Sequence, residues 1–412
     1  MNELSKEMRI IEGRSVSWVK GYKAAGIAAG IKSSGAKDLC VIYSETPAAA
    51  AATFTTNVVK AAPVLLDMIN INSGHIRALV TNSGNANACT GAEGYADAEA
   101  MAETAARKLG IDPGEVLVFS TGVIGVRLPM DKVTAGIDEC VGKLVSMADD
   151  GAAEAIMTTD LARKEIFIEL ELSGKTVSLA GMAKGSGMIH PNMATMLGYI
   201  LTDACITTDL LCKIQKESVA TSFNMISVDG DTSTNDSATI LANGCAGNDL
   251  IDTENEDYHK LKKAVDYINT FLARKIAADG EGATKLVEVD LAGAISDTDA
   301  AIMAKSVISS SLVKAAMHGS DANWGRILCA MGYSGASFDP SGVSVAFRSA
   351  AGEVAVFAKG KPVAFDEEKA LAVLGEAEVV IDVALSDGSG AAKSWGCDLS
   401  AEYVRINGSY RS

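Results

Sequence analysis

Aromatic residues and histidine are scarce in this 412-residue chain: Phe, Trp and Tyr make up 5% of it, and histidine occurs 4 times. The interior must therefore consist mainly of Ala, Val, Ile and Leu, while the 39 glycines allow many tight turns. The 8 cysteines are dispersed and none has the C-x-x-C spacing. We therefore expect no metal site, and we expect free thiols in the reducing environment of the cytoplasm.

Positive charge is also in deficit, since 36 Lys and Arg face 52 Asp and Glu and the net charge is -16. This balance argues against nucleic-acid partners and anionic membranes. The first ten residues lack the apolar core of a signal peptide, and the longest uncharged stretch, residues 185–202, is interrupted by His190, Pro191 and Asn192. We expect a globular cytoplasmic protein, of two or three domain-sized units or one large body.

Strand-like and helix-like patterns occur together along the chain. Residues 165–172 alternate apolar and polar side chains and precede a second strand-like run at 176–180, which predicts a hairpin. A second hairpin is predicted from 343–347 and 354–357. The fold class we expect is α/β of the α+β type, with mostly antiparallel sheets packed with helices. Helices are predicted at residues 95–109, 131–147, 258–276 and 304–317.

Several common catalytic motifs are absent. Glu169 stands where a phosphate-binding loop ending in Gly174-Lys175-Thr176 needs glycine, and His190 stands where a dinucleotide fingerprint needs glycine. Lys184 precedes Gly185-Ser186 where a nucleophile elbow needs glycine, and no H-E-x-x-H occurs. Nucleotide cofactors and zinc hydrolysis are therefore not the leading interpretations.

Four segments rich in Gly, Asn, Ser and Thr adjoin apolar, strand-like runs: residues 81–88, 120–125, 181–196 and 228–236. Taken singly, each is explained as a turn or a connector. Polar groups that are buried must be hydrogen-bonded, and four such segments together predict the walls of one polar pocket.

The stretch from Lys184 to Leu197, KGSGMIHPNMATML, resembles the cleavage-site motif of the ornithine acetyltransferase family, the glutamate N-acetyltransferases of the acetyl-cycling arginine pathway. Two positions depart from that pattern: His190 stands where many members have alanine, and Leu161 where a third threonine is expected. Further similar stretches follow in the order of the family: FTTN (54–57), TNSGNAN (81–87), TGVIG (121–125), MTTD (157–160), DGDTSTN (229–235), GEGATK (280–285), NWGR (323–326) and YVRIN (403–407).

This resemblance implies a precursor that cuts itself between Ala194 and Thr195. Residues 1–194 would form an α chain and residues 195–412 a β chain, together one folded body similar to the β-aminopeptidase fold. Thr195 would then be a nucleophile with its own base, since a free α-amine has a pKa of about 7.7–8.0 and accepts a proton near neutral pH.

The resemblance also implies the reaction: transfer of an acetyl group from N2-acetylornithine to glutamate through acetyl-Thr195, by a particle of two α and two β chains. No cofactor is implied, and acetyl-coenzyme A stays open as a second acetyl donor. Glu281 would hold the ornithine ammonium or polarise the new α-amine. The implied oxyanion donors are Thr121 and Gly122, and the implied substrate contacts are Thr158, Lys184, Thr195, Glu281, Asn407 and Ser412, with Thr159 less certain because of Leu161.

Two other functions are weighed against this one. A self-cleaving aminopeptidase or amidase of the related fold would hand the acyl group to water, and Lys184 and Glu281 favour the transferase over it. A non-catalytic binding protein would use the same segments as structural turns and would remain one intact chain.

Overall fold

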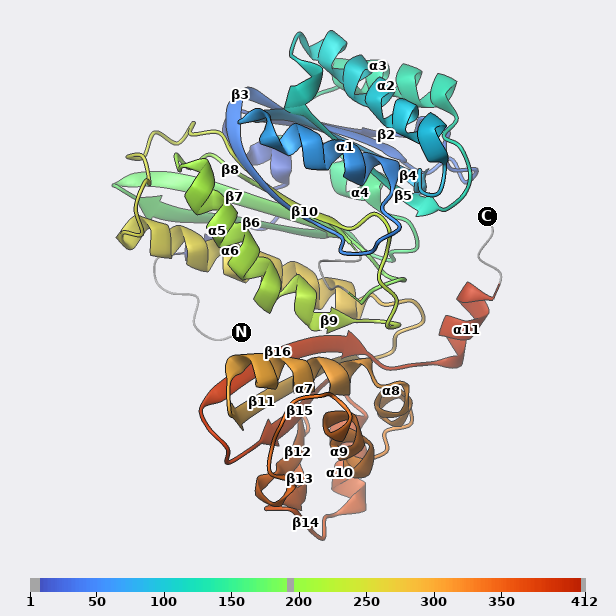
Figure 1. Cartoon of the computed structure of the whole chain (residues 1–412), viewed down its shortest axis with the longest axis vertical. Coiled ribbons are helices and arrows are strands. Elements are labelled where there is room, and N and C mark those ends of the chain that lie inside the picture. The colour runs from blue at the N-terminus through green and yellow to red at the C-terminus, as the bar shows by residue number, and fades with distance from the viewer. Residues whose placement is uncertain (1–7, 191–195, 409–412) are drawn as a thin grey trace.

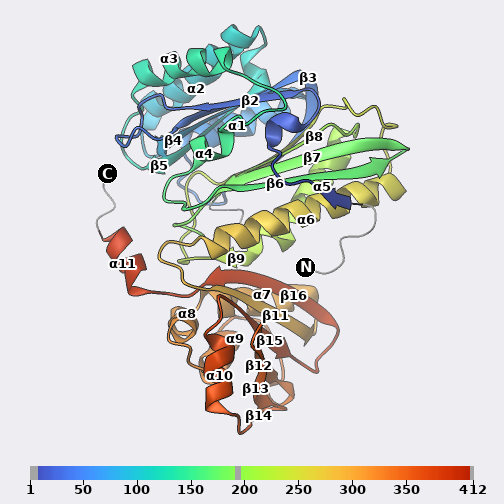
Figure 2. The same ribbon diagram turned by 180° about the vertical axis from the view of Figure 1, so that it is seen from behind.

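The computed structural model describes residues 8–190 and 196–408 and shows two lobes (Figure 1). Within these ranges, the first lobe contains a nine-stranded sheet and the second a seven-stranded sheet. The view from behind shows β9 (Ile226–Ser227) and β16 (Gly390–Cys397) at the boundary between the lobes (Figure 2). These two strands pair in parallel, so the first lobe contributes an edge strand to the second sheet.

The first sheet is mostly antiparallel, as predicted. Its strands are β1 (Met8–Ile10), β2 (Tyr22–Ile27), β3 (Leu39–Phe54), β4 (Ile76–Asn85), β5 (Val116–Val123), β6 (Lys164–Leu172), β7 (Lys175–Lys184), β8 (Leu197–Thr202) and β10 (Ser237–Ala242). They lie in the order β1-β6-β7-β8-β10-β3-β4-β5, and β2 also pairs with β3. Only the pairs β8–β10 and β4–β5 are parallel among these described strands.

The long strand β3 divides this sheet into two halves. Its residues 39–43 pair with β2 and β4, whereas residues 49–54 pair with β10. The halves pack against each other through a shared apolar core, in which Phe119 of β5 meets Tyr199 of β8 edge to face at 4.9 Å between ring centroids. The Tyr199 hydroxyl lies 2.9 Å from Thr81 Oγ1, which satisfies this buried polar group.

Helices cover both outer faces of the paired halves, giving a helix–sheet–sheet–helix arrangement (Figure 1). One face is covered by α2 and α3, and the other by α5 and α6, while α4 lies between the halves. The helices of this lobe are α1 (Ala62–Asn70), α2 (Gly91–Leu109), α3 (Met130–Gly142), α4 (Ala152–Ile156), α5 (Thr208–Thr221) and α6 (Glu256–Ala278).

The second sheet has the order β14-β13-β12-β15-β11-β16-β9. Its further strands are β11 (Leu286–Ala294), β12 (Ser344–Ser349), β13 (Gly352–Ala358), β14 (Lys361–Pro362) and β15 (Glu378–Ala384). The helices of this part are α7 (Asp297–Ser309), α8 (Ser311–His318), α9 (Trp324–Gly332), α10 (Glu367–Leu374) and α11 (Ala401–Asn407). In the described ranges no single helix has the length and apolar composition of a membrane span; α7 and α8 meet these criteria only together, across a bend of 57°.

The α/β class with mostly antiparallel sheets is confirmed, and so are both predicted hairpins. The first is formed by β6 and β7, whose two-residue turn at Ser173 and Gly174 has φ of 49° and 68°. Two positive φ angles are typical of a type I′ turn, which matches the twist of antiparallel strands. The helix predicted at 258–276 is α6, and Asn255 caps its first turn by accepting a hydrogen bond from Tyr258 N at 2.9 Å.

Two predicted helices were wrong in extent. The helix expected at 131–147 ends at Gly142, because Val145 instead exchanges backbone hydrogen bonds with Ala24 of β2. The helix expected at 304–317 is interrupted at Ser310, which ends α7 and caps α8 by accepting from Val313 N. In both cases a specific hydrogen bond, one distant in the chain and one local, outweighs helix propensity.

The predicted cleavage point, Ala194–Thr195, lies outside the described residues. The segments on either side of it nevertheless belong to one sheet, because β7 and β8 pair with Lys184 opposite Leu197. Two pieces with the predicted boundaries 1–194 and 195–412 would thus share the first sheet, and their separation would expose paired strand edges. The division itself stays a prediction.

Candidate active site

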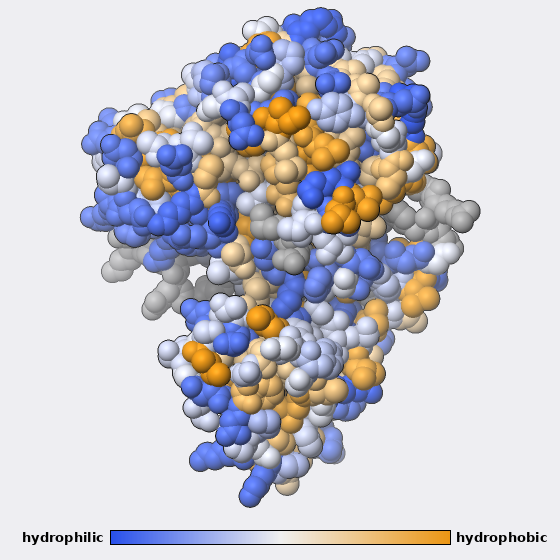
Figure 3. Space-filling view, in the orientation of Figure 1, coloured by the Kyte–Doolittle hydropathy of each residue, from blue (hydrophilic) through white to orange (hydrophobic). Residues whose placement is uncertain are grey.

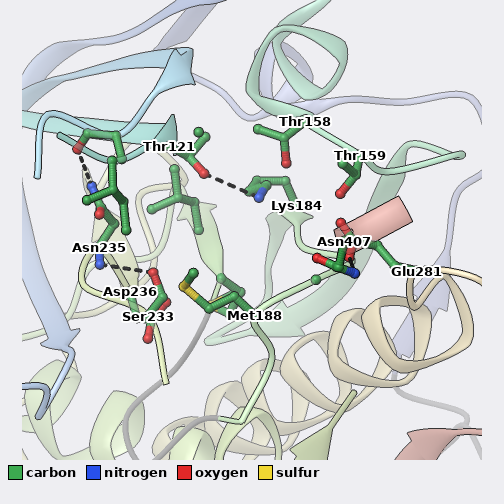
Figure 4. A pocket seen from close by; sticks show the side chains of 16 residues that line it. Thr121, Thr158, Thr159, Lys184, Met188, Ser233, Asn235, Asp236, Glu281 and Asn407 are labelled. Carbon is green, nitrogen blue, oxygen red and sulfur yellow. Dashed lines mark hydrogen bonds between the residues drawn. The ribbon is translucent and has the colours of Figure 1, made fainter. Parts of the chain in front are cut away.

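A pocket of about 110 Å³ opens where β5 and β7 end and where β8 and β10 begin (Figure 4). It therefore lies at the edge where the two halves of the first sheet meet. Its walls come from segments far apart in the sequence, and they include all four of the Gly- and Asn-rich segments predicted to form one pocket. The lining residues are Ala86, Thr121, Gly122, Ile124, Thr158, Thr159, Lys184, Gly187, Met188, Met196, Leu197, Ser233, Asn235, Asp236, Glu281 and Asn407.

Every predicted site residue that the structure describes lines this pocket. These residues are Thr121, Gly122, Thr158, Thr159, Lys184, Glu281 and Asn407. Ala194, Thr195 and Ser412 lie outside the described residues, so their predicted roles stay predictions. Met196 and Leu197, which follow Thr195 directly, are part of the lining.

The end of β5 carries Thr121 and Gly122, the two predicted oxyanion donors. Gly122 lies beside Gly84 of β4 and has φ of 132°, and a Cβ added there would lie 2.4 Å from the Gly84 carbonyl carbon. Only glycine fits this close approach of two strands. Asn235 fixes the same strand end, because its Nδ2 donates to Ser120 O at 2.8 Å and to Ala86 O at 2.6 Å.

Lys184 is the last residue of β7 and is only 7% exposed. Its Nζ donates a hydrogen bond of 3.3 Å to Thr121 Oγ1, so two predicted site residues are in direct contact (Figure 4). Burial lowers the pKa of Lys184, and the neighbouring ammonium of Lys164 acts in the same direction. The carboxylates of Asp160 and Glu281 oppose this shift, but burial is the larger effect and the pKa of Lys184 stays below its usual value.

A buried ion cluster, which no sequence motif had indicated, lies behind the pocket wall. Lys164 Nζ is 2.6 Å from Asp160 Oδ1 and 2.6 Å from Asp279 Oδ2. Asp160 also accepts from Gly185 N at 2.7 Å and from Thr158 N at 3.0 Å. Burial raises the pKa of the Asp160 carboxyl, but Lys184 and Lys164 outweigh it and the pKa falls to about 2. The sequence signal was an aspartate four residues before a strand lysine, a spacing too common to single out.

Glu281 and Asn407 form the opposite side of the pocket. Asn407 Nδ2, on α11, donates to Glu281 Oε2 at 2.7 Å, and Glu281 N donates to Ser186 O at 3.0 Å. A Cβ added at Gly187 would lie 2.3 Å from the same Glu281 oxygen, so a larger residue there would displace the Glu281 carboxylate. The C-terminal helix is thereby tied to the loop that follows Lys184.

Further hydrogen bonds fix the segment that connects the second sheet to α11. Ser400 Oγ donates to Gly282 O at 2.6 Å, directly after Glu281. Asp398 accepts from Thr284 N at 2.7 Å and from Lys285 N at 2.9 Å. These contacts explain how a helix near the end of the chain supplies a residue to a pocket in the first lobe.

The sequence profile of the ArgJ family matches residues 23–412, which is nearly the whole chain and includes every residue that lines the pocket. The chain belongs to the ArgJ family. It is 56% identical over 405 residues to the arginine biosynthesis bifunctional protein ArgJ 1 of Clostridium acetobutylicum, covering 98% of this chain and 99% of that protein. The family membership predicted from the sequence motifs is thus confirmed.

The chain is also similar to proteins of known structure. The ornithine acetyltransferase of Mycobacterium tuberculosis, complexed with ornithine, has 43% sequence identity and a TM-score of 0.43, covering 45% of this chain and 100% of that chain. The β-aminopeptidase of a Burkholderia species has 12% identity and a TM-score of 0.41, covering 66% of this chain and 90% of that chain.

The two departures from the ArgJ-family pattern lie beside the pocket and not in its lining. His190 Nδ1 is 3.1 Å from Ser227 Oγ, and burial, with the charge of Lys305, lowers the pKa of His190 to about 4. Its ring is therefore neutral near pH 7 and hydrogen-bonded to a serine of β9, outside the loop. Leu161 is 86% exposed, and its N donates to Asp279 Oδ2 at 3.0 Å, which leaves Thr158 and Thr159 as the lining threonines of this segment.

No group of three or more His, Cys, Asp or Glu side chains in residues 8–190 and 196–408 is arranged to hold a metal ion. The charged and polar groups that reach the pocket are instead an ammonium, carboxylates, hydroxyls and amides. Such groups recognise small zwitterions and can stabilise an oxyanion.

Proposed function

We propose that this chain is a glutamate N-acetyltransferase that takes the acetyl group from N2-acetylornithine. The observation that carries the proposal is one pocket that holds the buried ammonium of Lys184 and the carboxylate of Glu281 beside the Thr121–Gly122 strand end. Opposite charges suit substrates that carry both a carboxylate and an ammonium group. Curated relatives that match nearly the full chain are named as bifunctional proteins of arginine biosynthesis, which supports the same pathway.

The proposed first event is self-cleavage. The Thr195 hydroxyl attacks the carbonyl carbon of Ala194, the peptide C–N bond breaks, and an ester forms as the new α-amine takes up a proton. Water then hydrolyses the ester, which leaves a carboxylate on Ala194 and frees the Thr195 hydroxyl. The α-amine of Thr195 becomes the base for the transfer reaction.

Acetyl transfer would proceed in two balanced half-reactions. The α-amine of Thr195 accepts the proton of its own hydroxyl, whose oxygen attacks the acetyl carbonyl of N2-acetylornithine. The acetyl C–N bond breaks, the departing amine receives the proton, and ornithine leaves an acetyl-Thr195 ester. The amine of glutamate then attacks this ester, which releases N-acetylglutamate and restores the hydroxyl. Each step forms an oxyanion, for which Thr121 Oγ1 and Gly122 N are the proposed donors.

No cofactor takes part in the proposed reaction, because an amide is exchanged for an amide. Acetyl-coenzyme A is kept as a candidate second donor, in line with the word bifunctional in the names of the relatives. Transfer to glutamate from each donor in turn separates a one-donor from a two-donor enzyme. The cytoplasm is kept as the proposed location, since all 8 cysteines are free thiols and thiols persist in a reducing compartment.

A particle of two α and two β chains is also part of the proposal. Apolar side chains gather on the surface of the first lobe around α1 (Figure 3). Contiguous exposed apolar groups are typical of protein–protein contacts. Sedimentation equilibrium of the cut protein gives the number of chains in each particle. The exposed residues of this surface are Val58, Val59, Leu65, Met68 and Ile69.

The competing function is an amidase or aminopeptidase that passes the acyl group to water. We expect the protein, given N2-acetylornithine and glutamate, to form N-acetylglutamate and ornithine in equal amounts, with little acetate. Mass spectrometry of the products checks this. Acetate formed without N-acetylglutamate would establish the amidase, and a chain that forms neither product and remains uncut would be a binding protein.

Glu281→Gln separates the two roles considered for Glu281. If its carboxylate holds the side-chain ammonium of ornithine, KM for N2-acetylornithine rises about tenfold, the equivalent of about 1.4 kcal/mol and of a weakened charge-assisted hydrogen bond. KM for glutamate stays unchanged, because glutamate has no side-chain ammonium. Glutamine retains an oxygen for the Asn407 contact, so the pocket wall is kept.

Steady-state kinetics with each substrate varied in turn checks this prediction. A fall in kcat with both KM values unchanged would contradict it, and would instead assign Glu281 to the polarisation of the Thr195 α-amine.

A further inference from the structure

The contact between Lys184 and Thr121 constrains the direction of a proton. A lysine ammonium only donates hydrogen bonds, whereas a threonine hydroxyl both donates one and accepts. Lys184 Nζ lies 3.3 Å from Thr121 Oγ1, so in this pair the hydroxyl oxygen accepts. The single proton of Thr121 must therefore point away from Lys184. Both residues line the same pocket, so a Thr121 proton that points away from Lys184 can point into the cavity.

This direction depends on the charge of Lys184. A neutral amine carries a lone pair and would accept the Thr121 proton, which turns the hydroxyl away from the cavity. Lys184 is buried, and burial favours the neutral form. The charged groups that act on Lys184 are the carboxylates of Asp160, Glu281 and Asp236 and the ammonium groups of Lys164 and Lys32.

Asp160 is a fully buried carboxylate with three hydrogen-bond donors. Its side chain is 0% exposed, and it accepts hydrogen bonds from Lys164 Nζ, Gly185 N and Thr158 N at 2.6, 2.7 and 3.0 Å. Gly185 follows Lys184 directly, so this contact sets Asp160 next to the end of β7. Glu281, in contrast, is proposed to turn its charge to the substrate.

We propose that Lys184 and Asp160 are positioning residues for Thr121: the Lys184 ammonium directs the Thr121 proton into the pocket, and the Asp160 carboxylate keeps Lys184 charged. The inference rests on the proposed function, in which Thr121 donates to the oxyanion. In this proposal Lys184 has two roles. As a substrate contact it affects KM, and as a positioning residue for Thr121 it affects kcat. Asp160 is the strongest of the carboxylates that oppose the lowered pKa of Lys184.

The test is Asp160→Asn, which removes the charge and keeps the size of the side chain. We expect the ratio of kcat in the cut variant to kcat in the wild type to fall about tenfold as the pH is raised from 6 to 9, a loss smaller than the 10²–10³-fold typical of a deleted oxyanion donor. Taking this ratio cancels the titration of the Thr195 α-amine, which both proteins share. Lys184→Arg added to Asp160→Asn should remove the pH dependence, because arginine stays charged. An unchanged pH profile in Asp160→Asn would overturn the inference.

A double-mutant cycle tests whether the effect passes through Thr121. In a Thr121→Val background Asp160→Asn should change kcat less than twofold, since no hydroxyl proton is left to direct. Additive losses would overturn the inference. Asp203→Asn is the matched control, because Asp203 is a buried carboxyl that accepts from Ser178 N at 2.7 Å at the far end of β8. This control should leave the pH profile of kcat unchanged.

Lys184→Met replaces Asp160→Asn if the loss of Asp160 prevents folding. Lys184→Met should raise KM both in the wild-type background and in the Thr121→Val background, but it should lower kcat only in the wild-type background. Equal losses of kcat in the two backgrounds would overturn the inference. Failure of the proposed function gives a different result, namely acetate without N-acetylglutamate. The cycle can then be run on acetate release, because hydrolysis of the acyl ester also forms an oxyanion. A wild-type chain that forms neither product overturns both.

Discussion

A chain that carries Thr195→Ala is expected to remain a single polypeptide of 412 residues and to transfer no acetyl group. Alanine has no hydroxyl, so neither the attack on Ala194 nor the later acetyl ester can form. The loss should be complete within the detection limit, because one atom, Thr195 Oγ1, serves both reactions. In the proposed mechanism no other atom is the nucleophile of both self-cleavage and acetyl transfer.

Denaturing electrophoresis and intact-mass measurement check the cut, and product analysis checks the transfer. The wild type should give two pieces, residues 1–194 and 195–412, the second with threonine at its N-terminus. Thr195→Ser is the matched control: it keeps a hydroxyl and should be cut and active at a lower rate. Circular dichroism should show that Thr195→Ala has folded. A cut and active Thr195→Ala chain would place the nucleophile at another residue.

The sequence predicted those parts of the fold that depend on neighbours in the chain. The alternation at 165–172 and the turn at Ser173-Gly174 were enough to predict the hairpin of β6 and β7. The two wrong helix ends have different causes: Ser310 caps α8 through a local contact inside a helix-like run, whereas Val145 bridges to Ala24 across more than a hundred residues. The parallel pairing of β8 with β10 is likewise a long-range contact without a local pattern.

The candidate site was predicted for a different reason. Thr158, Glu281 and Asn407 have no spacing that joins them, and the resemblance to a family alone brought them together; the structure places them around one pocket. The supports behind them were missed. Asp160 was seen only as part of a short motif and Asn235 only as part of a polar run, because hydrogen bonds to distant backbone leave no periodic pattern in a sequence.

Lys164→Met is expected to lower the free energy of unfolding by about 3–5 kcal/mol. The Lys164 side chain is 2% exposed and lies between the carboxylates of Asp160 and Asp279, which are 0% and 13% exposed. Methionine fills a similar volume but has no ammonium group, so two buried carboxylates lose the positive charge that pairs with them. The cost arises from those remaining charges, more than from the loss of the ion pairs themselves.

Urea denaturation followed by circular dichroism checks this prediction. Lys143→Met is the matched control, since Lys143 also pairs with an acid four residues earlier, Glu139, but the two side chains are 58% and 54% exposed. An exposed pair of this kind contributes about 0.3–0.5 kcal/mol. Equal losses of unfolding free energy in Lys164→Met and Lys143→Met would show that the buried cluster stabilises the fold no more than an exposed ion pair does.

The pH dependence of the Lys164→Met effect identifies its cause. In the wild type the pKa of Asp160 is lowered to about 2 from 3.8, so its ionised form stabilises the fold above about pH 4, and this contribution is lost as the pH falls toward 2. In Lys164→Met the same carboxyl has one ammonium fewer and binds its proton more readily, which relieves the buried charge in acid. The difference in unfolding free energy between the wild type and Lys164→Met must therefore narrow as the pH falls from 7 to 4.

Asp279→Asn added to Lys164→Met should recover part of the lost unfolding free energy at pH 7, because it removes one of the two negative charges that Lys164 had paired, while Asp160 still faces Lys184. A difference between the wild type and Lys164→Met that is independent of pH would indicate lost packing of the lysine stem instead.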